Sequence, residues 1–90
     1  MKYLLIYEAA DDVLEQAPLH AAGHNAAWQR FHESGELVMI GPYSDASGAL
    51  GVFTNRAAAE AMAATDPFVT EGVVRSWRIV EWREILQPEG

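Results

Sequence analysis

The chain has 90 residues, which is enough for one domain and too few for two. It contains no cysteine, so disulfides and thiolate metal sites are excluded as sources of stability. The formal net charge of −7 comes from six basic and thirteen acidic residues, which argues against a nucleic-acid partner or an anionic membrane, because both require clustered Lys and Arg. Half of the residues are hydrophobic, which favours an oligomer for so small a domain.

The N-terminal segment indicates a cytoplasmic protein. Its apolar run, Tyr3–Tyr7, is too short for the core of a signal peptide, and no small-residue cleavage site follows it. No segment approaches the roughly 20 apolar residues that cross a membrane. The lack of cysteine is compatible with a reducing compartment.

The first half of the chain predicts a strand followed by a helix. Tyr3–Tyr7 is rich in aromatic and branched apolar residues and predicts a strand. Pro18 suits the first turn of a helix, where its missing N–H costs nothing, so we predict a helix from Pro18 to Ser34 that Gly35 ends. One face of this helix carries four residues at helical spacing: Ala21, His24, Trp28 and Phe31.

The second half predicts a hairpin, an alanine-rich helix and a last strand. The hairpin strands are expected over Glu36–Ile40 and Ala49–Thr54, joined by turn-forming residues. The later elements are a helix from Arg56 to about Thr65 capped by Asn55, one helical turn that starts at Asp66-Pro67 and ends at Gly72, and a strand over Val73–Arg83. A single domain would then span residues 1–90, with residues 85–90 as a loose tail.

The order of elements, βαββαβ, predicts an α+β, ferredoxin-like fold with a four-stranded antiparallel sheet and both helices on one face. Such a sheet alternates apolar and polar residues when its other face is wet. The first strand instead places Tyr3, Leu5 and Tyr7 on one side and the apolar pair Leu4 and Ile6 on the other. The face without helices therefore needs a cover. A second copy of the chain is the simplest one, which predicts a homodimer.

Several features follow one another in a recognisable order. They are the opening strand Lys2–Tyr7, a histidine about three turns before a terminal glycine (His24 and Gly35), Ile40-Gly41-Pro42, Asp66-Pro67-Phe68-Val69, and a last strand that reaches Trp82. Together, over nearly the whole chain, they resemble the YCII-related proteins, a branch of the dimeric α/β-barrel superfamily.

The resemblance implies a barrel made of two sheets that pack across a dimer, with a His–Asp pair in a cleft of each subunit. By position, this pair is His24 and Asp66. Family members often carry an arginine just before the histidine, whereas this chain has Ala21, Ala22 and Gly23. A cation that could hold an anionic substrate is therefore missing.

The residues themselves leave two interpretations of this pair open. His24 lies on the apolar stripe of its helix and is either a core histidine held by one hydrogen bond or a general acid and base, since histidine titrates near neutral pH. Asp66 before Pro67 is typical of a helix cap, a role that a carboxylate with two oxygens can combine with orienting a histidine. We predict a hydrogen bond between His24 and Asp66 across a pocket. Gly23, which costs about 1 kcal/mol in a helix interior, is compatible with a close approach by a ligand or a strand.

Other candidates are weaker. His20 and His24 share a helix face at the spacing of metal ligands, but no motif supplies a third ligand, so no metal is expected. His32, near the end of the helix, is interpreted as a solvated surface residue that suits the helix dipole. Tyr43 and Ser44 could line the mouth of a cleft.

The leading hypothesis is a small-molecule enzyme in which His24 moves a proton and Asp66 orients it, in a lyase or isomerase reaction on a small carbonyl compound or lactone, without a cofactor. Relatives implied by the resemblance include a chloromuconolactone dehalogenase, which removes HCl from a lactone, and more distant isomerases and cofactor-free monooxygenases. The alternatives are a non-catalytic ligand-binding or accessory protein and a cofactor-free monooxygenase. An open pocket at the pair would favour the enzyme over a binding protein with a buried structural histidine.

Overall fold

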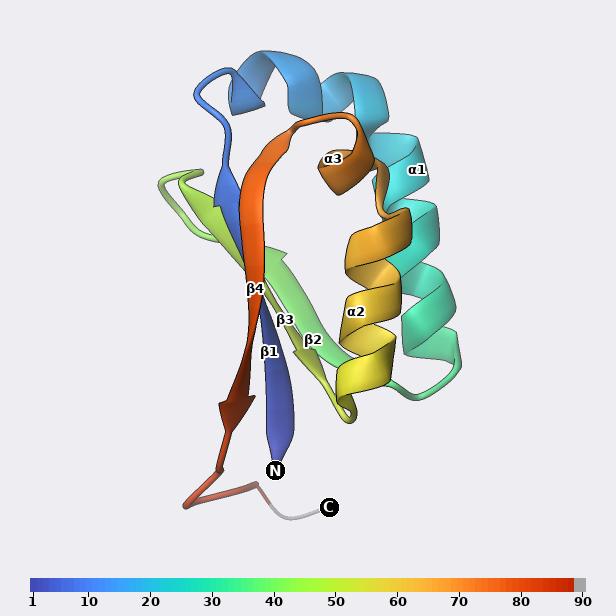
Figure 1. Ribbon diagram of the computed structural model, residues 1–90, viewed down its shortest axis with the longest axis vertical. Coiled ribbons are helices and arrows are strands. Elements are labelled where there is room, and N and C mark those ends of the chain that lie inside the picture. Colours follow the sequence, from blue (N-terminus) through green and yellow to red (C-terminus); the bar gives the residue numbers. More distant parts are fainter. Residues whose placement is uncertain (89–90) are drawn as a thin grey trace.

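The computed structural model describes residues 1–88. Its elements are β1 (Lys2–Ala9), α1 (Val13–Glu33), β2 (Leu37–Pro42), β3 (Gly48–Phe53), α2 (Arg56–Thr65), α3 (Pro67–Thr70) and β4 (Val74–Trp82). The helices lie together on one side of the sheet, and the N-terminus lies at the end of the sheet where β4 finishes (Figure 1). None of the helices within residues 1–88 is long and apolar enough to cross a membrane.

The four strands form one sheet in the order β2-β3-β1-β4, and every neighbouring pair is antiparallel. This arrangement confirms the predicted α+β, ferredoxin-like fold. In the register of the central strands, Leu5 of β1 lies between Gly51 of β3 and Ile79 of β4. β2 is an edge strand, which is where a sheet tolerates a proline such as Pro42 because no further strand needs its N–H.

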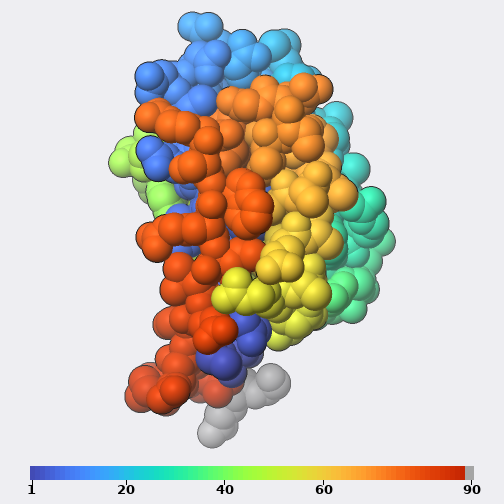
Figure 2. All heavy atoms as spheres, in the orientation of Figure 1, coloured from blue at the N-terminus to red at the C-terminus, as the bar shows by residue number. Residues whose placement is uncertain are grey.

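The core lies between the sheet and the helices. Leu5 and Tyr7 of β1 and Phe53 of β3 point toward the helices, where they pack with Phe31 of α1 and Met62 of α2. Three alanines of α2 are almost fully buried, which lets this helix lie close to the sheet: Ala58, Ala59 and Ala63. In the space-filling view, α2 and α3 lie directly beside β4 (Figure 2).

The opposite face of the sheet carries apolar side chains along its middle. Side chains alternate across a strand, so Leu4 and Ile6 point away from the helices. Their partners in the register share that face: Val52 and Val80 lie on either side of Leu4, and Leu50 and the exposed Arg78 lie on either side of Ile6. No helix within residues 1–88 covers them, as expected from the sequence of β1.

Helix α1 begins five residues earlier than predicted, at Val13, and Pro18 lies inside it. The prediction was wrong because Pro18 was taken as a start signal. The N–H that Pro18 lacks would have bonded to the carbonyl of Leu14, a residue that is 78% exposed, so water can serve that oxygen instead. The carbonyl of Asp12 accepts the first hydrogen bonds of the helix from Glu15 and Gln16.

The end of α1 matches the prediction. Gly35 adopts a left-handed conformation with φ of 83°, which glycine reaches without steric cost. Its N–H donates to the carbonyl of His32, and the N–H of Glu36 donates to the carbonyl of Phe31. This pair of bonds is a Schellman motif, and it turns the chain directly into β2.

The predicted cap at Asn55 is present, since its side chain accepts a hydrogen bond from the N–H of Ala58 at 2.8 Å. After β4, residues 83–88 form neither a helix nor a strand. Ile85 and Leu86 are exposed, whereas the Glu84 side chain is nearly buried and binds Lys2. The remainder of the expected tail, residues 89–90, lies outside the described residues.

Candidate active site

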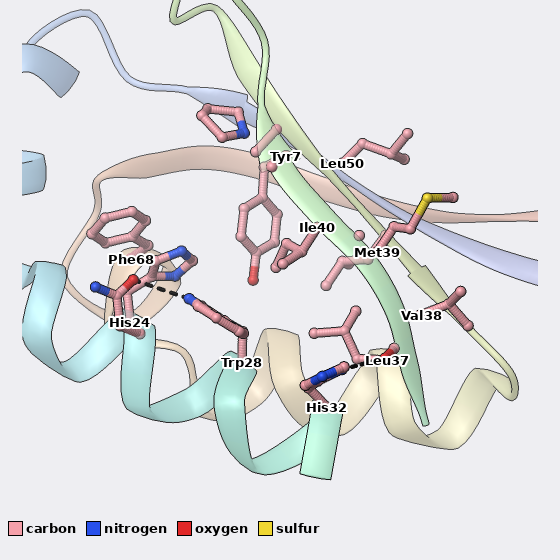
Figure 3. A pocket seen from close by; sticks show the side chains of 16 residues that line it. Tyr7, His24, Trp28, His32, Leu37, Val38, Met39, Ile40, Leu50 and Phe68 are labelled. Carbon is pink, nitrogen blue, oxygen red and sulfur yellow. Dashed lines mark hydrogen bonds between the residues drawn. The ribbon is translucent and has the colours of Figure 1, made fainter. Parts of the chain in front are cut away.

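A cavity of about 570 Å³ lies between α1 and the β2–β3 end of the sheet. Its wall is mostly apolar and comes largely from the two strands. The polar and aromatic side chains that line it are Tyr7, His24, Asn25, Trp28, His32 and Phe68. Three of these, His24, Trp28 and His32, follow one another along α1 and face β2 (Figure 3). This volume is within the range of small-molecule sites.

His24 and Asp66 meet at the cavity as predicted. The Nδ1 atom of His24 lies 3.0 Å from each carboxylate oxygen of Asp66. The Asp66 side chain is fully buried, whereas that of His24 is 16% exposed and borders the cavity. The imidazole stacks on the Phe68 ring, with 3.9 Å between centroids and 4° between planes. Asp66 and Phe68 therefore fix both the position and the tilt of the imidazole.

Asp66 also caps α3, as expected from the Asp-Pro signature. Its Oδ1 atom accepts a hydrogen bond from the N–H of Phe68 at 2.9 Å, and its Oδ2 atom accepts one from the hydroxyl of Tyr7 at 2.8 Å. One buried carboxylate thus holds three donors, which offset the cost of removing it from water. The cap and the contact with His24 use the same group, so the start of α3 sets the orientation of the histidine.

These contacts determine which nitrogen of His24 is free. A carboxylate can only accept hydrogen bonds, so Nδ1 carries the hydrogen and the neutral ring leaves a lone pair on Nε2. Within residues 1–88, no hydrogen bond reaches Nε2. Since the ring lines the cavity, this nitrogen is available to a bound molecule. The arrangement matches that of an imidazole oriented by a carboxylate for proton transfer.

Tyr7 is a member of the site that sequence reasoning missed. Burial, followed by the charge of Asp66 and the hydrogen bond to it, raises the pKa of Tyr7 well above 10.0. Tyr7 therefore remains a hydrogen-bond donor to Asp66 throughout the physiological range. The sequence places Tyr7 on the inward side of β1, but it does not distinguish a tyrosine of the site from any other aromatic residue of the core.

Gly23 explains how α1 comes close enough for this contact. A Cβ atom at Gly23 would lie only 2.8 Å from Cγ of Pro67, closer than real Cβ contacts. The absence of that atom lets α1 touch the first residue of α3. The sequence suggested that a ligand or a strand comes close to Gly23. In the structure, the close neighbour of Gly23 is Pro67.

Comparisons with known proteins establish the family and the fold. The model of the YCII-related domain matches residues 1–83. The chain belongs to the YCII-related family. No curated protein sequence matches it. Among solved structures, it is similar to 5-chloro-2-hydroxyhydroquinone dehydrochlorinase from Burkholderia phenoliruptrix AC1100, in complex with 2,5-dihydroxybenzoquinone. The TM-score is 0.75 at 16% identity, with 92% of this chain and 94% of that chain covered, which establishes the shared fold.

The other site residues that the sequence of this YCII-related protein suggested differ in whether they line a cavity. His20 does not line the cavity, and residues 1–88 contain no group of three or more His, Cys, Asp or Glu side chains that could hold a metal. His32 is exposed, as expected, but it also lines the cavity, so its interpretation as a surface residue was incomplete. Tyr43 lines a second, smaller cavity of about 230 Å³, whereas Ser44 lines neither.

Proposed function

We propose that this YCII-related protein is a cofactor-independent enzyme that moves a proton to or from a carbon atom next to a carbonyl group, in a lyase or isomerase reaction on a small carbonyl compound or lactone. The observation that carries the proposal is the environment of His24. Its Nδ1 atom is held by a fully buried carboxylate, while its ring borders a cavity of about 570 Å³.

The reaction requires little besides this pair. Nε2 of His24 removes a proton from the carbon atom and leaves the electron pair delocalised onto the neighbouring carbonyl oxygen. The resulting imidazolium is stabilised by the Asp66 carboxylate, which keeps its own charge. In an isomerase, His24 returns the proton to a different carbon atom. In a lyase, the electron pair expels a leaving group from the adjacent carbon, and His24 releases the proton to water.

The structural neighbour supports this class of reaction by analogy. That protein is described as a dehydrochlorinase, and its structure contains a hydroxylated quinone. Function resides in the site rather than in the fold, so the analogy favours the reaction class and leaves the compound open.

The proposal is tested by deuterium exchange. The full-length protein is incubated in D₂O with a panel of lactones and hydroxyquinones, and incorporation of deuterium at carbon is followed by NMR. We expect exchange with at least one compound and a loss of 10²-fold or more in His24→Gln, which is the usual contribution of a general base. Asp66→Asn should lower the rate while the protein stays folded. His20→Gln, on the same helix but outside the cavity, serves as the matched control.

Two results would contradict the proposal. Exchange that persists in His24→Gln would show that another group moves the proton. Saturable binding of panel compounds, with no exchange by the wild-type protein, would favour the non-catalytic ligand-binding alternative.

We also propose that the protein works as a homodimer. The supporting observation is the apolar sheet face opposite the helices, where Leu4, Leu50 and Val80 lie together by register. Trp82 is paired with Lys2 at one end of this face, and Trp82 is 43% exposed. A second copy of the same sheet would bury both faces at once.

A further inference from the structure

The cavity contains a second histidine with the same bonding pattern as His24. Nδ1 of His32 lies 3.3 Å from the backbone carbonyl oxygen of Leu37, the first residue of β2. A carbonyl oxygen only accepts, so Nδ1 carries the hydrogen and Nε2 keeps its lone pair. The Schellman motif at Gly35 places Leu37 opposite the last turn of α1 and so holds this contact in place.

The two histidines stand at opposite ends of an apolar wall. They are eight residues apart on one helix, which is about 12 Å along its axis. Trp28 lies between them (Figure 3). Its indole N–H is already donated to Oδ1 of Asn25 at 3.0 Å, so Trp28 offers the cavity an apolar ring surface. Nε2 acceptors at both ends and a flat apolar surface between them define the shape of a ligand.

The lack of charged side chains in the cavity wall indicates that the ligand is uncharged. None of the described residues that line the cavity is Lys, Arg, Asp or Glu. A full charge on a bound molecule would find no opposite charge to offset its removal from water.

We propose that His32 is a second polar anchor, and that the substrate is an uncharged, flat ring compound with oxygen substituents at two opposite ends. A hydroxyl group at one end donates to Nε2 of His32, and the other end is presented to Nε2 of His24. The helix rise sets the two histidines about 12 Å apart along α1, and a six-membered ring with a hydrogen bond of about 3 Å at each end has a comparable length. The choice of His24 as the reacting end rests on the proposed function, whereas the anchoring by His32 is a binding property.

The experiment compares hydroquinone, which has hydroxyl groups at opposite ends of its ring, with phenol, which has one. Both are titrated anaerobically into ¹⁵N-labelled full-length protein, and affinity is measured by NMR. We expect the wild-type protein to bind hydroquinone about 10-fold more tightly than phenol. His32→Phe should reduce the affinity for hydroquinone to that for phenol. His32→Gln, which keeps an acceptor on the side chain, should restore part of the difference, and His20→Phe should change nothing.

Failure of this inference differs from failure of the proposed function. Equal affinities of hydroquinone and phenol for the wild-type protein, or equal weakening of both by His32→Phe, would overturn the role of His32, while deuterium exchange at His24 reports separately on catalysis. If neither compound binds the wild-type protein, the proposed substrate class is wrong. If His32→Phe fails to fold, the affinities of the His32→Gln variant for hydroquinone and phenol still test the role of His32.

Discussion

Asp66 is the residue on which most of the site depends, because its buried carboxylate binds Tyr7, His24 and the N–H of Phe68. Removing one of these donors leaves part of a buried charge unpaired. Tyr7→Phe keeps the shape of the side chain and deletes only its hydroxyl group. We expect the free energy of unfolding to fall by about 1.5–3 kcal/mol, the range for hydrogen bonds to charged groups. Urea denaturation measures this value.

Tyr3→Phe, four residues away on the same face of β1, is the matched control and should change stability little. A Tyr7→Phe variant as stable as the wild type would show that water replaces the hydroxyl group at Asp66.

The pH dependence of the free energy of unfolding gives a second readout for Tyr7. Because the pKa of Tyr7 is raised above 10.0, its contribution is complete below pH 10 and is lost as the pH rises further. Tyr7→Phe should lack this alkaline loss.

Glu84 makes a separate prediction for acid stability. Its carboxylate accepts a hydrogen bond from Nζ of Lys2 at 2.7 Å. This bond, with further bonds from its own backbone and from the N-terminal ammonium group, lowers the pKa of Glu84 from 4.5 to about 2. The stabilisation is therefore present above pH 4.5 and is lost as the pH falls toward 2.

Glu84→Gln should remove this acid-sensitive component, so that its stability changes less than that of the wild type over this pH range. Thermal unfolding at a series of pH values is the measurement. Glu60→Gln, at an exposed position on α2, is the control. Parallel pH profiles for the wild type and Glu84→Gln would show that the contact with Lys2 contributes nothing in solution.

At the scale of elements, the distance between α1 and α3 governs the site. Gly23→Ala raises the helix propensity of α1 by about 1 kcal/mol, yet the added Cβ atom would meet Cγ of Pro67 at 2.8 Å. We expect α1 to move away from α3 and the contact between His24 and Asp66 to weaken. The readouts are the rate of deuterium exchange and the NMR signal of the Nδ1 hydrogen of His24.

Pro67→Ala in the same chain removes the ring that the new Cβ atom would meet, so the double variant should regain much of the lost activity. A loss in Gly23→Ala that the second substitution leaves unchanged would contradict the steric explanation. Full activity in Gly23→Ala would show that the glycine is dispensable for the approach.

The same elements show what the sequence could predict. The order of the elements along the chain and the caps follow from local chemistry, so Asn55, Gly35 and Asp66 were identified correctly. The contact between His24 and Asp66 followed from family position. The start of α1 was missed because a proline inside an exposed helix is tolerated when water serves the freed carbonyl, which the sequence does not display. Tyr7 and His32 were missed because their roles depend on contacts with Asp66 and Leu37, which are distant in sequence or lie across a turn.

For the whole molecule, the apolar face of the sheet predicts a dimer. Light scattering at micromolar concentration should give about twice the mass of the 9.9 kDa chain. Val80→Asp places a charge in the middle of this face and should yield a monomer, because burying an unpaired carboxylate in an apolar interface is costly. Glu71→Asp, outside the sheet, is the control. A wild-type protein that stays monomeric under these conditions would contradict the paired-sheet arrangement.

The proposed function requires that the buried carboxylate of Asp66 hold His24 so that Nε2 is free to move a proton. ¹⁵N NMR of the imidazole, recorded at a pH where the ring is neutral, tests it most directly. We expect one dominant tautomer with the hydrogen on Nδ1 of His24, and loss of that dominance in Asp66→Asn. A hydrogen on Nε2, or a mixture of tautomers that Asp66→Asn leaves unchanged, would contradict it.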